Sequence, residues 1–380
     1  SAPRYHFIKT VIKKFLQKIF KKISYAIFLK IYGKIEKSIK CSQDKRIKVK
    51  IVNIDKDLSY RVYNISNGRL YTDRIHDTAV LLDNKIIEEP SFQLRYEGPL
   101  IHNSNIKDNI VFKKGTPRKL RNLNGSVLSL LTGGAGNENY FHWLSDVLPR
   151  LVLCDRTVSL SEIDYFLLPD DVKKFQSETL DCLNIPKHKR LSSKKFRHIK
   201  AKKLIVTDHP VVTSVRGIKD THKIPGWIIL WLRNVFLSKN TAINKKHKNK
   251  IYIDRSETTN NYQPQRSISN EDEIKKYLLK NNFILAKLHE MKFSEQIDLF
   301  YNAESVVGLH GAGLANVVFC KSGTRVIELQ STYAGPMYEN LAKKNDLNYT
   351  SIAVEAKQSS PNQQGHIHIP ISSLNKILEN

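Results

Sequence analysis

Apolar residues near the N-terminus recur at every third or fourth position. Between residues 5 and 40 this spacing predicts an amphipathic helix, because such positions share one face of a helix. The opposite face is almost all lysine: Lys9, Lys13, Lys14, Lys18, Lys21, Lys22, Lys30, Lys34, Lys37 and Lys40. A basic helix of this kind suits the surface of an anionic membrane. The alternative is a helix packed on its own domain with a solvated face, and the lysine density favours the membrane.

The pattern then changes to the two-residue alternation of β-strands. Residues 46–83 contain the runs IKVKIVNI, SYRVYNIS and GRLYTDRI, with a turn expected at Asn67-Gly68. Further strands are expected at 126–131, 164–169 and 202–206, and a helix at 225–237. Strands alternating with helical segments predict an α/β sheet. The polar, basic stretch 238–250 lacks apolar periodicity and is predicted to be an interdomain linker.

Strands and helices alternate at shorter spacing in the second half. Strands are expected from residue 251, ending in a charged tip at 254–256, and at 282–288, 304–309 and 323–329; helices are expected to start at 269–273 and to lie at 294–302, 314–319 and 338–345. This alternation predicts a parallel, Rossmann-like sheet, which binds ligands at the carboxyl ends of its strands. A last helix at 371–378 is expected to pack back on the first domain.

Composition limits the class of protein. The chain has 380 residues, enough for two domains, and its 41% hydrophobic content excludes wholesale disorder. The net charge of +26 favours anionic partners such as nucleic acid, anionic lipid or phosphorylated substrates. Four widely spaced cysteines indicate neither a zinc site nor a disulfide framework, and no apolar run approaches the length of a membrane span.

A Gly-rich turn, HGAG at 310–313, joins the strand and helix predicted on either side of it. A helix entered through glycines is an anion site, because its first backbone N–H groups are unpaired. Arg255, Arg266 and Glu328 are expected at the same edge of the sheet. The arginines would hold a diphosphate and the carboxylate the ribose hydroxyls. The turn matches neither G-x-G-x-x-G nor a P-loop, which counts against NAD enzymes and NTPases.

A second candidate site lies in the first half. A Gly-rich loop at 132–139 precedes a helix on which Asn139, His142 and Asp146 share one face. One His and one Asp beside such a loop fit an acid/base site. The alternative is a capped helix with His142 in a structural hydrogen-bond network, and chemistry alone leaves both open. The D-x-D at residues 55–57 gains no further ligands from its surroundings, so no metal site is predicted.

These motifs together resemble glycosyltransferase family 61. The resemblance is carried by YFHWLSDVLPR at 140–150, YIDR at 252–255, Arg266, NE at 270–271 and HGAGLAN at 310–316. The family includes bacterial capsular-polysaccharide enzymes, plant xylan-decorating transferases and animal protein-O-linked GlcNAc transferases. The resemblance covers residues 126–349 and implies a GT-B architecture, in which two Rossmann-like domains face a cleft. It further implies inverting, metal-independent transfer from a nucleotide sugar, with UDP-sugars as the default donor.

The resemblance also implies residue roles. The donor-binding residues would be Arg255, Arg266, His310, Gly311, Ala312, Gly313, Leu314, Asn316 and Glu328. The catalytic base would come from the first domain, as Asp146 or His142, and sequence does not decide between them. Gly134 and Asn139 would lie on the acceptor side. No cofactor is expected, because the nucleotide sugar is a substrate.

The expected organisation follows. The predicted segments are a membrane-associating helix at 1–40, an acceptor-side α/β domain at 41–237, the linker at 238–250, a nucleotide-sugar-binding domain at 251–350 and a tail at 351–380. A glycan acceptor in cell-surface polysaccharide synthesis and a peripheral position on the cytoplasmic side of an inner membrane are expected, or a Golgi or ER lumen in a eukaryote.

Two other function classes compete. The first is a nucleic-acid-binding protein; against it, the lysines cluster in the first helix and the linker rather than alternating with aromatic residues on a sheet. The second is a non-catalytic glycan-binding relative, which the intact arginines, His310 and Glu328 disfavour.

Overall fold

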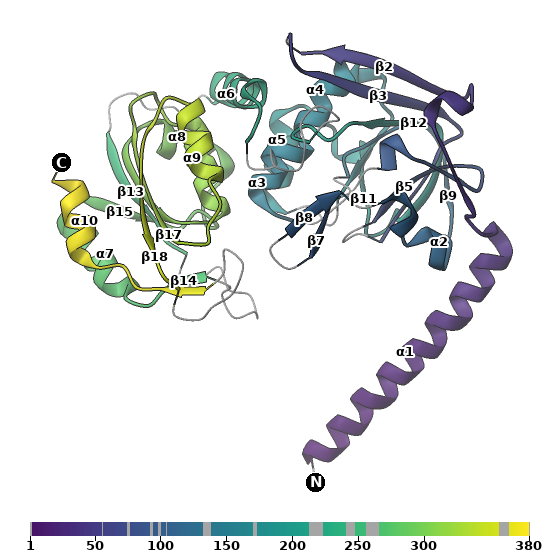
Figure 1. Cartoon of the computed structure of the whole chain (residues 1–380), viewed down its shortest axis with the longest axis horizontal. Helices are drawn as coiled ribbons and strands as arrows, with labels where there is room; N and C mark the ends of the chain where they lie inside the picture. The colour runs from purple at the N-terminus through teal and green to yellow at the C-terminus, as the bar shows by residue number, and fades with distance from the viewer. Residues whose placement is uncertain are drawn as a thin grey trace.

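The computed structural model contains two large β-sheets with helices around them, two small two-stranded sheets in its described part, and a long N-terminal helix (Figure 1). It describes residues 2–379 except for 55, 74–76, 92–93, 98–99, 104, 132–137, 170–172, 213–222, 241–247, 256–265 and 357–364. The predicted α/β fold class is confirmed.

The first sheet is mixed. Its strands in the described part of the chain are β1 (Lys37–Ile39), β2 (Ile47–Asn53), β3 (Ser59–Ser66), β4 (Arg69–Thr72), β5 (Thr78–Leu82), β6 (Lys85–Ile87), β9 (Arg121–Ser129), β10 (Tyr165–Leu168), β11 (Arg190–Ser192) and β12 (His198–Thr207). The order is β1-β6-β5-β4-β12-β9-β10-β11, and β3 joins β2 to β12. Strands β12, β9, β10 and β11 run parallel, whereas β2–β5 form antiparallel pairs. Strand β9 ends before the segment that carries His142 and Asp146.

The second sheet is entirely parallel, as the alternation of strands and helices predicts. Its order is β15-β13-β16-β17-β18. The strands are β13 (Asn249–Ile253), β15 (Phe283–Ala286), β16 (Ala303–Leu309), β17 (Arg325–Ser331) and β18 (Asn348–Val354). Chain order reverses between β13 and β16, so their carboxyl ends form the crevice where open parallel sheets bind ligands.

Helices cover both faces of this second sheet. They are α7 (Glu271–Lys280), α8 (Phe293–Tyr301), the 3₁₀-helix η8 (Ala312–Phe319), α9 (Met337–Lys344) and α10 (Ile371–Leu378). In Figure 1, α8 and α9 lie on one face of the sheet and α7 and α10 on the other. The predicted helix after the Gly-rich turn is therefore present, but with the tighter 3₁₀ winding.

The tail packs on the second sheet, and not on the first domain as expected. Tyr277 of α7 donates a hydrogen bond from its hydroxyl to Oδ1 of Asn375, at 2.6 Å. Strand β19 (Gly365–Ile367) pairs with β14 (Arg266–Ile268). The reason is burial: Leu374 is fully buried in the hydrophobic cluster around β13, β16 and α7.

The α- and π-helical segments within residues 140–239 lie on the side of the first sheet that faces the second (Figure 1). They are α3 (Tyr140–His142), the π-helical η4 (Trp143–Val147), α4 (Pro149–Asp155), α5 (Lys174–Cys182) and α6 (Gly226–Lys239). Helix α6 contacts both units: Trp227 Nε1 donates to the Tyr60 hydroxyl at 2.9 Å, and Arg233 donates to the carbonyl oxygen of Val318 at 2.7 Å. The predicted linker thus begins inside α6 and ends inside β13, and residues 241–247 lie outside the described residues.

The remaining elements are peripheral to these layers. They are α2 (Val111–Lys114), β7 (Leu94–Glu97), β8 (Leu100–Asn103), η1 (Cys41–Gln43), η2 (Glu89–Ser91), η3 (Ile106–Asp108), η5 (Leu160–Glu162) and η6 (Lys187–Lys189). Strands β7 and β8 form an antiparallel hairpin.

Helix α1 (Ala2–Tyr32) projects away from the first sheet and is attached near its C-terminal end (Figure 1). The Tyr32 hydroxyl accepts a hydrogen bond from the Leu120 amide at 2.8 Å, and its ring packs edge-on against His198 at 5.0 Å. Further along the helix, apolar side chains such as Phe15 and Phe20 are exposed. Among the described residues, no helix combines the length and apolar character that a membrane crossing requires.

Candidate functional site

The Gly-rich turn after β16 places His310 against the neighbouring strand. The register pairs Gly308 with Glu328, so the first residue after β16 lies close to the Glu328 side chain. His310 Nδ1 hydrogen-bonds to Oε1 of Glu328, and Oε2 of Glu328 accepts from the Tyr349 hydroxyl at 2.5 Å. His310 and Glu328 are both buried. Glu328, predicted to bind ribose, thus has a protein partner at each carboxylate oxygen and orients His310.

Two arginines converge on the same turn. Arg255 follows β13 and Arg266 begins β14, and Nη1 of each donates to the carbonyl oxygen of His310, at 3.4 and 2.9 Å. Burial lowers the pKa of both guanidinium groups, and the charge of Arg255 lowers the pKa of Arg266 further. Two positive charges held this close favour an anion beside them.

Gly311 lets Arg255 lie against the turn. An added Cβ at Gly311 would be 2.7 Å from Arg255 Nη1, closer than such atoms approach. The Gly311 backbone is extended, with φ 166° and ψ 171°, a conformation that any residue adopts. The glycine is therefore required for the space it leaves and not for its backbone angles.

The residues that follow the turn are bonded to the protein. The Leu314 amide, predicted to contact the donor, donates to the carbonyl oxygen of Gly311 at 3.0 Å, and its side chain is fully buried. Asn316, also predicted to contact the donor, accepts from the Tyr140 hydroxyl at 2.6 Å and donates to Gln296 Oε1 at 3.0 Å. Asn316 thereby joins the two units.

A cavity of about 240 Å³ opens beside these residues, between the two units. Tyr140 and Phe175 line it from the first unit, and Arg255, Ala312 and Gly313 are among the residues that line it from the second. The cavity lies at the carboxyl ends of β13 and β16, the switch point of the parallel sheet. Aromatic walls and a half-buried arginine suit a ligand with a planar apolar part and a negative charge.

The first unit contributes a histidine–carboxylate pair. His142 Nδ1 lies 2.6 Å from Asp146 Oδ2, and Ser145 Oγ donates to Asp146 Oδ1 at 2.8 Å. The structure thus brings His142 and Asp146 together. Asn139 is the N-cap of α3, and its side-chain oxygen accepts from the amide of Phe141 at 2.9 Å.

Electrostatics assign different roles to the two partners. Burial disfavours the Asp146 carboxylate, but its electrostatic interactions with His142 and His209 and its hydrogen bonds with His142 and Ser145 outweigh burial and lower the pKa of Asp146 to about 2. Burial likewise disfavours the His142 imidazolium, but the Asp146 charge raises the pKa of His142 above its ordinary value. The side chain of His142 is 25% exposed and that of Asp146 is 9% exposed. His142 is therefore the member that a substrate can reach.

Aromatic rings connect the two halves of the site. Phe141 packs edge-on against His142 at 5.4 Å and against Tyr338 at 5.8 Å, and Tyr338 packs against His310 at 5.0 Å. Sequence reasoning missed Tyr338, Tyr349 and His209 as site residues. No motif marks them, because α9, β18 and the end of β12 reach the site only through the tertiary fold.

One predicted site residue and one residue of the discounted D-x-D fall outside the described part of the chain. Gly134, expected on the acceptor side, and Asp55 of the D-x-D lie outside the described residues. Within the described ranges, no group of three or more His, Cys, Asp or Glu side chains could hold a metal ion.

Comparison with known proteins gives two matches. Residues 140–327 match the family described as Glycosyltransferase 61. The chain is also similar to the EGF domain-specific O-linked N-acetylglucosamine transferase of Gallus gallus, with 30% identity over 106 residues, which are 27% of this chain and 20% of the relative. The chain thus spans about a fifth of the length of that curated relative. The family match includes both the His142–Asp146 pair and the Gly-rich turn.

Proposed function

We propose, on the premise that this chain belongs to glycosyltransferase family 61, that it transfers a sugar from a nucleotide-sugar donor to a glycan acceptor with inversion at the anomeric carbon. The carrying observation is the cavity between the two units, with two arginines on one side of the site and a histidine–carboxylate pair on the other. The two sheets would be the two domains of a GT-B enzyme. A UDP-sugar is the donor that the family resemblance favours, and a cell-surface polysaccharide is the proposed acceptor.

The donor would bind at the carboxyl ends of β13 and β16. Its diphosphate would lie against Arg255 and Arg266, whose charges take the place of a metal ion as the leaving group forms. The nucleoside would occupy the cavity beside Ala312 and Gly313. His310, held by Glu328, would keep the turn in the shape that presents the two guanidinium groups.

His142 is the proposed base, which the sequence left undecided between His142 and Asp146. The Nδ1 proton of His142 points to the Asp146 carboxylate, so Nε2 carries the lone pair. The acceptor oxygen bonds to the anomeric carbon while the bond from that carbon to the diphosphate oxygen breaks. The electron pair leaves with the nucleoside diphosphate, and the hydroxyl proton moves to Nε2 of His142. Asp146 then stabilises the imidazolium.

Nucleotide binding and turnover test this proposal. Purified protein is expected to bind one of UDP, GDP, dTDP or CMP in calorimetry with EDTA present, and to release that nucleotide from its sugar conjugate when acceptor is added. Arg266→Ala is expected to abolish binding, whereas Arg121→Ala, at an exposed position of β9, should bind as wild type does. Loss of all turnover in EDTA would refute the metal-free mechanism.

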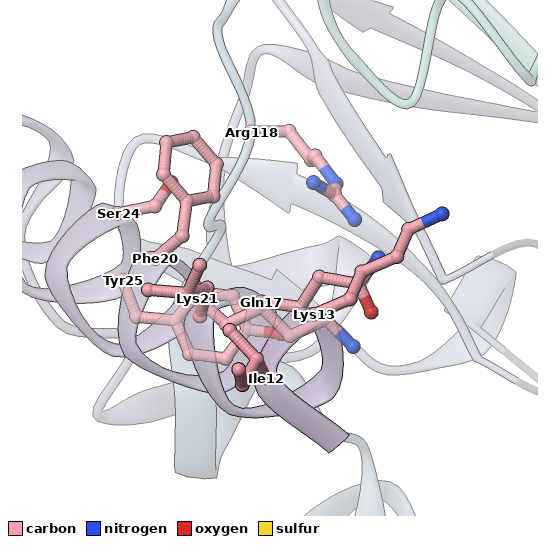
Figure 2. A pocket seen from close by; sticks show the side chains of 9 residues that line it. Ile12, Lys13, Gln17, Phe20, Lys21, Ser24, Tyr25 and Arg118 are labelled. Carbon is pink, nitrogen blue, oxygen red and sulfur yellow. The ribbon is translucent and has the colours of Figure 1, made fainter. Parts of the chain in front are cut away.

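We also propose that α1 attaches the protein to an anionic membrane surface, in a peripheral position. A groove of about 800 Å³ runs along the helix, and Figure 2 shows its apolar and cationic lining, including Phe20, Tyr25, Lys13, Lys21 and Arg118. Apolar side chains with lysines and an arginine beside them match an acyl-chain surface with negative headgroups.

Vesicle co-sedimentation tests the attachment. The double variant Leu16→Gln with Phe20→Gln removes two exposed apolar side chains of α1. It is expected to stay in the supernatant when phosphatidylglycerol vesicles are pelleted, whereas wild-type protein pellets with them. Ile51→Gln is the matched control, because Ile51 is equally exposed but lies on β2. Equal pelleting of all three proteins would remove the membrane proposal.

A further inference from the structure

Asp146 lies between two histidines, and the second has no role in the site described so far. His209 follows β12, and its Nε2 lies 3.7 Å from Asp146 Oδ2, the same oxygen that His142 Nδ1 contacts. The His209 side chain is 4% exposed. It therefore reaches no substrate and acts, if at all, through Asp146.

The backbone around His209 selects its tautomer. The amides of Val211 and Val212 both donate to His209 Nδ1, at 3.2 and 3.1 Å. A ring nitrogen that accepts hydrogen bonds carries a lone pair, so the proton of the neutral ring is on Nε2. That Nε2–H faces the Asp146 carboxylate.

Arg150 fixes the distance between the two segments. Its Nε donates to the Asp146 carbonyl oxygen at 2.9 Å, and its Nη1 donates to the Thr207 carbonyl oxygen at 3.2 Å. The helical segment that carries Asp146 is thus tied by one buried side chain to the end of β12, two residues before His209. The His209–Asp146 approach is a built feature of the fold.

We propose, resting on the transferase function above, that His209 is a positioning residue whose Nε2–H, with Nε2 3.7 Å from Asp146 Oδ2, stabilises the Asp146 carboxylate electrostatically and so sets the basicity of His142. Ser145 holds one carboxylate oxygen of Asp146, and the two histidines share the other. The hydrogen bonds from His142 and Ser145 and the nearby N–H dipole of His209 each stabilise the negative charge of the carboxylate. With His209 in place, the Asp146 carboxylate attracts the His142 proton less strongly, so the pKa of His142 is lower than it would be without His209. The proposed base therefore returns more readily to its unprotonated form.

Burial, helped by two neighbouring positive groups, keeps the His209 ring neutral at physiological pH. Burial is the main cause; Asp146 opposes it, whereas Arg150 and His142 act in the same direction as burial, and the pKa of His209 is lowered to about 4. Glu89 and Asp208 line a small cavity of about 20 Å³ beside the ring. A neutral His209 contributes a donor without adding a second positive charge next to the His142 imidazolium.

Two variants of His209 distinguish the contribution of ring atom Nδ1 from that of Nε2. His209→Asn keeps an oxygen near the Nδ1 position for the Val211 and Val212 amides but cannot reach Asp146. His209→Gln places an amide N–H near the Nε2 position instead. We expect His209→Asn to lower kcat roughly tenfold, to leave the donor KM unchanged, and to move the acidic limb of the pH profile upward. His209→Gln should retain most of kcat and the wild-type profile.

Nitrogen-15 NMR of the histidine rings is the second readout. Wild-type protein is expected to show the Nε2–H tautomer at His209, and His209→Asn to show a raised pKa for His142. An Nδ1–H tautomer, or a His209→Asn variant with wild-type kcat and pH profile, would overturn the inference alone. If wild-type protein releases no nucleotide from any donor, the inference falls together with the proposed function.

Discussion

Gly311→Ala is the most specific perturbation of the proposed donor site. The new Cβ would lie 2.7 Å from Arg255 Nη1 and 3.3 Å from its Cζ, so the guanidinium must move away from the turn. The Gly311 backbone is extended, and alanine adopts that conformation without strain. Arg255 is a long, flexible side chain, so the shift should cost little stability. The change is therefore expected to act on binding and not on folding.

The magnitude follows from the contact that is displaced. Arg255 would lose its position beside Arg266 and one charge-assisted hydrogen bond to a donor phosphate. Such a bond contributes about 1.5–3 kcal/mol, and each 1.4 kcal/mol is a factor of ten in affinity. Gly311→Ala should therefore weaken nucleotide binding by roughly ten- to hundredfold.

Isothermal titration calorimetry with the nucleotide that wild type binds measures this directly. Gly226→Ala is the matched control, because an added Cβ at Gly226 meets nothing within 4 Å and the residue opens α6, away from the turn. The control should bind as wild type does. An unchanged Kd for Gly311→Ala, with Arg255→Ala strongly impaired, would refute the steric reasoning; unchanged binding in both would refute the donor site.

Three further predictions concern the base and its surroundings. Asp146→Asn should lower kcat about 100-fold or more in turnover assays, because His142 loses the carboxylate that orients it. The nucleotide Kd, measured by calorimetry, should stay constant. A kcat similar to that of wild type would exclude the His142–Asp146 pair as the base. His142 must be unprotonated to act as the base, and the Asp146 charge raises the pKa of His142 above its ordinary value of 6.5. As pH is lowered, kcat/KM should therefore begin to fall at a pH above 6.5. A flat pH profile of kcat/KM down to pH 5 would contradict this. Glu328→Ala should lower the free energy of unfolding, measured in urea melts, by about 3 kcal/mol, because His310 and Tyr349 lose their shared buried partner. An unaltered urea melt would show that the contacts of Glu328 with His310 and Tyr349 are dispensable.

The acid stability of the protein should depend on Asp146 as well. Its pKa is lowered from 3.8 to about 2 in the folded state, so the carboxylate stabilises the fold above pH 4 and loses that contribution as pH falls toward 2. Asp146→Asn should therefore flatten the loss of stability across that window, as followed by circular dichroism. A parallel loss in variant and wild type would contradict the assignment.

The sequence predicts the second sheet better than the first. Between β13 and β17, each strand pairs with one close in the chain, and β-α alternation alone specifies a parallel sheet. In the first sheet, β12 pairs with β3, β4 and β9, which are distant in sequence, and no local pattern encodes those partners. Helix α10 is a similar case. Its apolar face shows from the sequence that the helix is buried, but the sequence does not show against which sheet it packs.

The candidate site shows the same limit at the level of single residues. His142 and Asp146 are spaced by one helical turn, so their contact could be predicted from the sequence. Apolar periodicity does not distinguish the winding of η8 or of η4 from that of an α-helix, so the partner of the Leu314 amide was missed. His209 and Tyr338 reach the site from segments that carry no motif, and only the packing of the strand ends brings them there.

Binding of a nucleoside diphosphate in the presence of EDTA tests the central claim most directly. We expect wild-type protein to bind one of UDP, GDP or dTDP without a divalent cation, and the double variant Arg255→Ala with Arg266→Ala to bind none of them while melting at a similar temperature. Equal binding by wild type and the double variant, or no binding of any of the three by wild type, would contradict a donor site built on these two arginines.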